Sequence, residues 1–360
     1  EFVVLLGDLK SPQDIETVAH KILDAVKAPF DIASSDIFVT ASIGIALYPG
    51  QGGDAMTLLR NADAAMYRAK SGGKNKYEYF EETLGQEKAE RQRLKEQLRR
   101  AFEEKQFEVY YQPQFEVTNK SIVGFEALLR WKHPEFGMIL PLSFIPVAEE
   151  SGIILKIGQW VIEQVCEQLR RWREDGFETS VAINISALQF MRDEFFKVLH
   201  EAIGRNHLPP QSLELELSEG VVMQNIEESA RQMSRLHELG VRLTVDDFGT
   251  GYSSLAYLRR LPLSKLKIDQ SFIRDVYAQT QARQLLNSMI LLAHSLNLKV
   301  CAEGVEAEGE FRVLRELDCD FAQGFLLGKP LVVDDVPTLS HAQGAAPVRP
   351  QKAFCRACGS

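Results

Sequence analysis

The sequence lacks the uncharged apolar run of roughly 18 residues that a membrane-spanning helix needs, and no signal peptide is evident at its start. It also lacks an excess of positive charge, because the net charge of -9 argues against a surface that coats a nucleic-acid polymer. Its five cysteines are too few and too scattered for a disulfide framework and fit a reducing compartment. We therefore predict a cytoplasmic chain without a membrane segment, and tethering of a longer protein to a membrane stays open.

What is present is an ordinary globular composition over 360 residues, 45% hydrophobic and 25% charged, which suits one large domain and a smaller unit. Residues 1–80 are expected to form the smaller α/β unit. The patterns predict a strand in EFVVLLGD, a helix from about Pro12 to Val26, a strand over Ile37–Tyr48 and a helix from about Ala55 to Lys70. Because no turn precedes the first apolar strand, we expect the chain to begin in mid-domain.

Residues 81–105 are dense in Glu, Lys, Arg and Gln, with few apolar positions. This pattern favours a largely solvated connecting helix stabilised by charge pairs along its surface. A coiled-coil dimer seam stays open as an alternative, but the apolar spacing does not sustain enough heptads to favour it.

Residues 106–335 alternate between apolar strand candidates and helical stretches, among them 155–173, 226–239 and 277–296. The strand candidates span 107–115, 122–129, 180–185, 213–217, 241–245, 265–268, 299–302 and 321–325. Such alternation predicts parallel strands, and eight of them favour a TIM-like (β/α)8 barrel over an open sheet. Only a short NKS turn separates the first two strands, so this pair should be antiparallel. Residues 336–360 are expected to form a flexible tail, whose CxxC motif is weak evidence for metal binding.

The stretch GVRLTVDDFGTGYSSL, over residues 240–255, delivers two adjacent acids, Asp246 and Asp247, to the end of a predicted strand. Neighbouring carboxylates repel each other, so such a site needs cations or a shared proton. The alternative is a solvated turn in which one aspartate caps the following helix.

The other predicted strand ends decide between these interpretations, because the carboxyl ends of barrel strands converge on one mouth. They carry Glu126 and Arg130, Asn184, Glu216 and Glu219, Lys267 and Asp269, Glu303 and Glu306, and Gln323. Crowded acids cost several kcal/mol unless they are neutralised. Oxygen ligands without His or Cys favour Mg²⁺ or Mn²⁺ over zinc.

Two such ions about 3.5–4 Å apart are a common device for attacking a phosphodiester, and an acidic site needs them to accept an anionic substrate. Asp246, first of the adjacent pair, is the natural bridge between the ions. Lys267 lies where an ammonium could orient the attacking water or steady a phosphate, and the Arg130 fork could grip a phosphate.

At these residues the chain resembles the EAL family of cyclic di-GMP phosphodiesterases, over roughly residues 106–331. The motifs match in kind, order and spacing: YYQP at 110–113, EALLRW at 126–131, NIS at 184–186, ELSE at 216–219, DDFGTGYSSL at 246–255, KLKIDQSFI at 265–273, AEGVE at 302–306 and QGFLLGKPL at 323–331. The resemblance implies the EAL fold, a barrel with one antiparallel strand.

Carried over position by position, the resemblance implies ligands for two ions. One ion is held by Glu126, Asn184, Glu216 and Asp246. Asp246 and Asp247 hold the second, and Glu303 positions the metal site or water. Lys267 is implied to be the partner of the hydrolytic water.

The remaining implied roles concern substrate and loop. Gln112, Arg130 and Gln323 are implied to line the substrate site, with Glu306 in a supporting or substrate-side role. Glu219 is implied to brace the loop after Asp247, a loop that in this family also contributes to the dimer face.

The resemblance implies hydrolysis of cyclic di-GMP to linear 5'-pGpG, with Mg²⁺ or Mn²⁺ as cofactor and Ca²⁺ as an inhibitory ion that permits binding without turnover. It also implies a homodimer through the EAL domain. The alternatives are a catalytically weak cyclic di-GMP receptor and a dimerising scaffold that the N-terminal unit regulates.

The N-terminal unit resembles the C-terminal half of a GGDEF, or diguanylate cyclase, domain. Glu1 and Phe2 could close its signature, ASIGIALYP matches a later strand, and NADAAMYRAKSGGKNKY matches its end. Because the upstream half of that domain carries the nucleotide loop and most metal ligands, we predict no cyclase activity for this chain.

Overall fold

The computed structural model describes residues 2–7, 12–27, 30–32, 35–37, 40–72, 75–80, 84–251 and 258–336. The chain forms two compact units, one of residues 1–96 with 134–136 and one of residues 97–133 with 137–360. Among the described helices, none is long and apolar enough to cross a membrane. The predicted tail, including Cys355 and Cys358, lies almost wholly outside the described residues.

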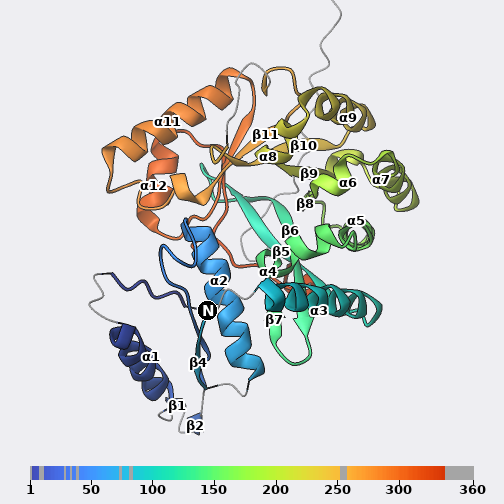
Figure 1. Ribbon diagram of the computed structural model, residues 1–360. Coiled ribbons are helices and arrows are strands. Elements are labelled where there is room, and N and C mark those ends of the chain that lie inside the picture. Colours follow the sequence, from blue (N-terminus) through green and yellow to red (C-terminus); the bar gives the residue numbers. More distant parts are fainter. Residues whose placement is uncertain are drawn as a thin grey trace, which may run out of the picture. The chain divides into compact units, whose positions relative to one another are not determined.

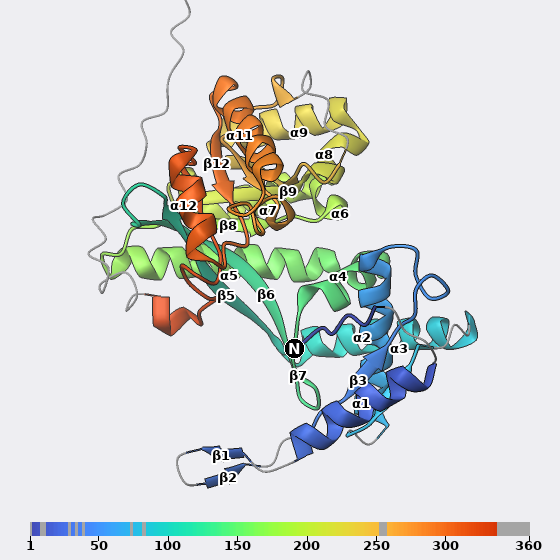
Figure 2. The same ribbon diagram turned by 90° about the vertical axis from the view of Figure 1, so that its left-hand side faces the viewer.

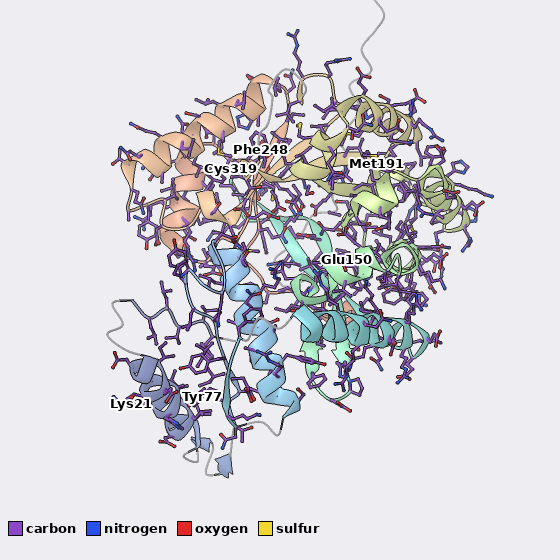
Figure 3. The ribbon with its side chains drawn as sticks, in the orientation of Figure 1. Lys21, Tyr77, Glu150, Met191, Phe248 and Cys319 are labelled. Atoms are coloured by element: carbon purple, nitrogen blue, oxygen red, sulfur yellow. The ribbon has the colours of Figure 1, made fainter. Side chains whose placement is uncertain are left out.

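The described residues between 2 and 80 in the first unit form two helices and two small sheets. Its elements are α1 (Pro12–Lys27), β1 (Phe30–Ile32), β2 (Ser35–Ile37), β3 (Ile43–Ile45), α2 (Ala55–Ser71) and β4 (Tyr77–Tyr79). β1 and β2 pair antiparallel, whereas β3 and β4 pair parallel. α2 begins where the Asp54 side chain accepts a hydrogen bond from Thr57 N at 2.8 Å. Figure 3 labels Lys21 on α1 and Tyr77 on β4.

Both predicted helices of this unit are present, but its predicted strands are wrong in extent. Residues 2–7 form no strand, and Phe2 and Leu5 are 101% and 92% exposed. A strand needs a hydrogen-bonded partner, and no described strand pairs with these residues. Of the strand predicted over 37–48, Ile37 ends β2 and only Ile43–Ile45 forms β3, because its partner β4 offers three residues.

The second unit is a barrel with helices on its outside. The helix α3 (Leu84–Glu103), within the predicted 81–105 segment, begins in the first unit and ends in the second. The strands of the second unit are β5 (Phe107–Glu116), β6 (Ile122–His133), β7 (Gly137–Ile139), β8 (Val181–Asn184), β9 (Leu213–Ser218), β10 (Arg242–Phe248), β11 (Lys265–Ile268), β12 (Lys299–Ala302) and β13 (Phe321–Ala322).

The helices of this unit follow the strands in the alternating order that the sequence predicts. They are α4 (Pro141–Glu150), α5 (Ile154–Glu174), α6 (Ala187–Phe190), α7 (Asp193–Arg205), α8 (Glu219–Gln224), α9 (Ile226–Leu239), α11 (Thr280–Ser295) and α12 (Glu308–Glu316), with short 3-10 turns η1 (Pro210–Ser212), η2 (Gln270–Phe272) and η3 (Val333–Asp335). Figure 1 shows α5, α7, α9, α11 and α12 around the outside of the strands.

The strand order is β5-β13-β12-β11-β10-β9-β8-β6-β7, and a further pairing of β5 with β6 closes eight of these strands into a barrel. β5 runs antiparallel to both of its neighbours, β6 and β13, while the remaining barrel neighbours pair parallel. The prediction of a barrel with one antiparallel strand is therefore confirmed.

Two details differ from the sequence-based expectation. β6 continues past the predicted end at residue 129 to His133, because the short strand β7 pairs antiparallel with its last residues. Figure 2 shows β5 and β6 as a long pair with β7 at one end. The strand predicted over 321–325 stops at Ala322.

Side chains of the parallel strands alternate between two environments. In β9, Leu213, Leu215 and Leu217 are buried, and Glu214 and Glu216 lie between them. Because successive side chains of a strand point to opposite faces, the leucines share one face and the glutamates the other. In β11, Lys265 and Lys267 alternate with Leu266 and Ile268 in the same way. One face of these strands thus carries charge.

The charged face is the inside of the barrel. Lys265 on β11 contacts Gln114 on β5 at 2.9 Å, although β12 and β13 separate these strands in the sheet. The contact therefore crosses the interior. Barrel interiors are usually filled with branched apolar side chains, and this one is instead filled in part by hydrogen-bonded polar groups.

Candidate functional site

Lys267 lies at the centre of the predicted site, with a fully buried ammonium surrounded by carboxylates. Its Nζ is 2.5 Å from Glu303 Oε1, 2.9 Å from Glu216 Oε2, 3.1 Å from Glu126 Oε2 and 3.5 Å from Asp246 Oδ2. These side chains come from β6, β9, β10, β11 and the residue after β12. The barrel thus brings together groups that are far apart in the sequence.

Asp247 joins this cluster from the end of β10. Ligand atoms of Asp246, Asp247 and Glu303 all lie within 4.8 Å of one another, an arrangement that could hold a metal ion. Asp247 has a positive φ of 54°, a conformation that Asp and Asn adopt more readily than other non-glycine residues. Its backbone N–H donates to Asp246 Oδ1 at 2.9 Å, so the backbone turn orients the first carboxylate.

The charges in the cluster are unbalanced. Burial raises the pKa of Glu216 well above its usual value, and nearby Glu126 adds to this increase. Burial also raises the pKa of Asp246 and raises that of Glu303 to about 8, in both cases against the opposing effect of Lys267. One ammonium is therefore too little positive charge for these acids.

The pKa values of the other two acids, Asp247 and Glu126, shift in opposite directions. Partial burial raises the pKa of Asp247 to about 6, and Asp246 contributes to the increase. For Glu126, burial raises the pKa, but Lys267 and hydrogen bonds from Gln323 and Asn184 outweigh it, so the net shift is downward. Among the five acids of this cluster, Glu126 is thus the one that the surrounding protein best stabilises in its charged form.

Glu126 accepts hydrogen bonds on both oxygens. Asn184 Nδ2 donates to Oε1 at 2.6 Å, and Gln323 Nε2 donates to Oε2 at 2.7 Å. Gln323 Nε2 also donates to Gln112 Oε1 at 3.1 Å, and Gln112 Nε2 donates to the Gly328 carbonyl. The Asn184 amide nitrogen faces Glu126, so the Asn184 side-chain oxygen is the atom that could bind a cation.

One further observation, independent of the charges, indicates that these oxygen ligands fit divalent cations. Glu216 Oε1 is buried and has no hydrogen-bond partner among the described residues. An unpaired carboxylate oxygen in the interior costs free energy that a bound cation would recover. Together with the excess of acids over Lys267, this orphan oxygen favours a metal centre made of oxygen ligands.

Two other predicted residues, Glu219 and Arg130, are described with contacts of their own. Glu219 Oε2 accepts from Gly249 N at 2.9 Å, so the start of α8 contacts the backbone just after Asp247. Arg130 donates to the Leu129 carbonyl at 2.9 Å, and its guanidinium lies 5.9 Å from the Tyr110 ring centre. Residues 252–257 of the predicted loop lie outside the described residues.

Glu306 and Asp269 form their described hydrogen bonds with other parts of the chain. The Glu306 side chain is exposed, and its backbone N–H donates to Glu310 Oε2 at 2.9 Å. Asp269 caps η2 by accepting from Ser271 N at 2.9 Å, although its charge still contributes to the raised pKa of Asp247.

Sequence reasoning missed a second polar cluster in the barrel interior. Lys265 Nζ lies 2.6 Å from Glu214 Oε1, Thr244 donates to the same oxygen at 2.7 Å, and Lys265 donates to Gln114. The alternation in LELELS and KLKI was the available signal, since a parallel strand buried on both faces normally reads as a continuous apolar run.

The family model described as "EAL domain" matches residues 95–330. That range covers more than half of the chain. The chain belongs to the EAL domain family. A second model, "Diguanylate cyclase, GGDEF domain", matches residues 1–76 and thus the first unit.

Curated relatives resemble the chain over nearly its whole length. The bifunctional diguanylate cyclase/cyclic di-GMP phosphodiesterase MucR of Pseudomonas aeruginosa is 41% identical over 93% of this chain and 49% of its own length. The cyclic di-GMP phosphodiesterase PdeR of Escherichia coli is 38% identical over 92% of this chain and 50% of its own. The chain therefore spans about half the length of these relatives.

Solved structures agree with the barrel. A structure described as PaMucR phosphodiesterase in complex with c-di-GMP is 41% identical, with a TM-score of 0.66, and the match covers 68% of this chain and 99% of that chain. The EAL enzyme Bd1971, bound to cAMP and cyclic di-GMP, is 35% identical with a TM-score of 0.67, covering 71% of this chain and 70% of that chain.

Proposed function

We propose that this chain is a metal-dependent phosphodiesterase that hydrolyses cyclic di-GMP to linear 5'-pGpG. The observation that carries the proposal is the single cluster in which Lys267 contacts Glu126, Glu216, Asp246 and Glu303. Relatives named as cyclic di-GMP phosphodiesterases, and a related structure in complex with that nucleotide, support this choice of substrate.

Two divalent ions, Mg²⁺ or Mn²⁺, are proposed to bind in this cluster. Glu126, Asn184, Glu216 and Asp246 would hold one, and Asp246 with Asp247 the other, with Glu303 positioning the site. When bound, such ions supply a water of lowered pKa and neutralise charge on the phosphodiester. Ca²⁺ is expected to occupy the site and inhibit, because its longer and more flexible coordination suits binding better than turnover.

The chain's own residues are proposed to prepare the site for an anion. Lys267 provides the fixed positive charge, and its contacts with three strands hold it where it can orient the attacking water. Glu303, whose pKa is raised by burial to about 8, is placed to accept or hold a proton near Lys267.

The substrate is proposed to contact groups on the first two barrel strands and after the last one. The Arg130 guanidinium can bind a phosphate through two parallel hydrogen bonds. Gln112 and Gln323 would line the site, and Glu306 would act from its substrate side. Glu219 is proposed to brace the backbone after Asp247 through its bond to Gly249.

A hydrolysis assay tests the proposal directly. Purified chain with Mg²⁺ or Mn²⁺ should convert cyclic di-GMP to 5'-pGpG, and Glu126→Ala should abolish product. Binding of the nucleotide without any linear product in either metal would instead favour the alternative, a cyclic di-GMP receptor. Light scattering at several concentrations tests the further proposal of a homodimer through the EAL domain.

A further inference from the structure

A row of buried polar side chains connects the interior ion pair with Glu126. Lys265 Nζ lies 2.6 Å from Glu214 Oε1 and donates to Gln114 Oε1 at 2.9 Å. Gln114 Nε2 donates to Gln323 Oε1 at 3.1 Å, and Gln323 Nε2 donates to Glu126 Oε2 at 2.7 Å. All five side chains are at most 5% exposed, so water cannot easily replace any of these bonds.

The direction of every bond in this row is determined by its two ends. An ammonium only donates and a carboxylate only accepts, whereas an amide has one accepting and one donating end. Lys265 must therefore meet the Gln114 oxygen, which leaves the Gln114 amino group facing Gln323. Gln323 then presents its oxygen to Gln114 and its amino group to Glu126 and to the Gln112 oxygen.

We propose that Gln114 is a positioning residue that, anchored by the Lys265–Glu214 ion pair, fixes the amide orientation of Gln323 so that an N–H always faces Glu126. In the described part of the chain, the Gln114 side chain forms no hydrogen bond with the metal-site acids. Its effect passes through Gln323, whose donor shares Glu126 Oε2 with Lys267.

The orientation matters because Glu126 is a proposed metal ligand. A reversed Gln323 would place a carbonyl oxygen against the Glu126 carboxylate and remove one of its three donors. Repulsion would then turn the carboxylate or favour its protonated form, and either change weakens a cation site. This inference rests on the proposed function only where turnover of cyclic di-GMP is measured. The measurement of Mn²⁺ affinity does not depend on that function.

Two substitutions at Gln114 separate hydrogen-bond direction from packing. Gln114→Glu keeps the shape of the side chain and the bond from Lys265. It places a second carboxylate oxygen, an acceptor, against the Gln323 oxygen. Gln323 then lies between the acceptors of residue 114 and Glu126. Gln114→Met fills similar space and presents no oxygen, so Gln323 can keep its donor on Glu126. The exposed Gln159 on α5 offers a matched control, Gln159→Glu.

The main measurement is the affinity for Mn²⁺ alone, by calorimetry at pH 8, well above the ordinary carboxyl pKa. Gln114→Glu should bind Mn²⁺ at least tenfold more weakly, even though an added negative charge by itself would tighten cation binding. Gln114→Met and Gln159→Glu should stay within about threefold of the parent chain. The rate kcat with cyclic di-GMP should fall in the same order.

A packing role predicts the opposite order, because Gln114→Met loses two hydrogen bonds and Gln114→Glu loses one. Parent-like Mn²⁺ affinity in folded Gln114→Glu, or weaker binding in Gln114→Met than in Gln114→Glu, would overturn the proposal. If Gln114→Glu does not fold, Gln114→Met still decides, because Mn²⁺ binding weakened by more than about threefold there would indicate a packing role and overturn the proposal.

Failure of the proposed function leaves a different pattern. A parent chain that binds Mn²⁺ but yields no linear dinucleotide contradicts the phosphodiesterase proposal alone. The order of the Mn²⁺ affinities among the variants then still decides whether Gln114 controls Glu126.

Discussion

Lys267 and Glu216 form an ion pair in which neither side chain has any exposed surface, with Nζ and Oε2 2.9 Å apart. Glu216 extends from β9 and Lys267 from β11, on either side of β10 in the sheet. The pair therefore lies on the inner face of the barrel, over β10. Its ammonium is the charge around which the other site acids gather.

Replacing the lysine should be costly because it leaves buried acids without a counter-charge. We expect Lys267→Met to abolish cyclic di-GMP hydrolysis and to lower the free energy of unfolding by about 3–5 kcal/mol without metal. Urea unfolding in EDTA measures the loss. The matched control is Lys197→Met, since Lys197 is 77% exposed and its 3.8 Å pair with Glu201 should contribute less than about 1 kcal/mol. Equal stability of the two variants would contradict the electrostatic role of Lys267.

Divalent cations should stabilise the chain through the orphan oxygen of Glu216. Ligand binding to the folded state at 100 times Kd adds about 2.7 kcal/mol to the free energy of unfolding. We expect Mg²⁺, Mn²⁺ and Ca²⁺ each to raise Tm, and Glu216→Gln to remove most of the increase because the amide carries no charge. A Tm that responds equally to Mn²⁺ in both proteins would place the ion elsewhere.

Glu219 should control turnover without controlling the barrel fold. Glu219→Ala removes the acceptor for Gly249 N, so the backbone beside Asp247 loses its brace, and we expect kcat to fall at least tenfold with Tm reduced by only a few degrees. Glu219→Gln keeps an accepting oxygen and should retain most activity. Loss of the folded state in Glu219→Ala, or undiminished turnover and Mn²⁺ affinity, would count against this role.

Asp320, away from the acids around Lys267, should give the stability a defined pH dependence. Burial raises its pKa, but hydrogen bonds from Lys299, His294 and Val300 N outweigh it, so the folded pKa lies below 3.8. A lowered carboxyl pKa stabilises the folded state above the unfolded value, and the contribution disappears as pH falls through the folded pKa.

At pH 7 we therefore expect Asp320→Asn to lower the free energy of unfolding by about 1–3 kcal/mol, with the difference from the parent shrinking as the pH falls below the unfolded pKa of 3.8. Asp318→Asn is the control, because that side chain is exposed and Asn tolerates the positive φ of 54° there. Urea titrations from pH 3 to 7 measure both. A difference that persists unchanged at pH 3 would rule out the charged form as its source.

Hydrophobic patterning determined much of the barrel in advance. The segments 265–268 and 299–302 match β11 and β12 because four residues between turn signals suit a strand and are too few for a helix. The short NKS turn determined the antiparallel pairing of β5 and β6, since no crossover fits there. The first unit was less predictable, because its strands depend on partners that local sequence does not specify.

The sequence by itself determined which residue types reach the barrel mouth, through strands that end in Asp246, Lys267 and other polar residues. Only the tertiary structure decided that Lys267 is fully buried among four carboxylates, and that Lys265 and Gln114 meet Gln323 inside the barrel. The physical reason is barrel closure, because strand pairing across the sheet sets which inward side chains face one another. The alternation in β9 and β11 indicated that charged side chains point inward. Their hydrogen-bond partners and the direction of each bond depend on distances in space, which the sequence pattern does not give.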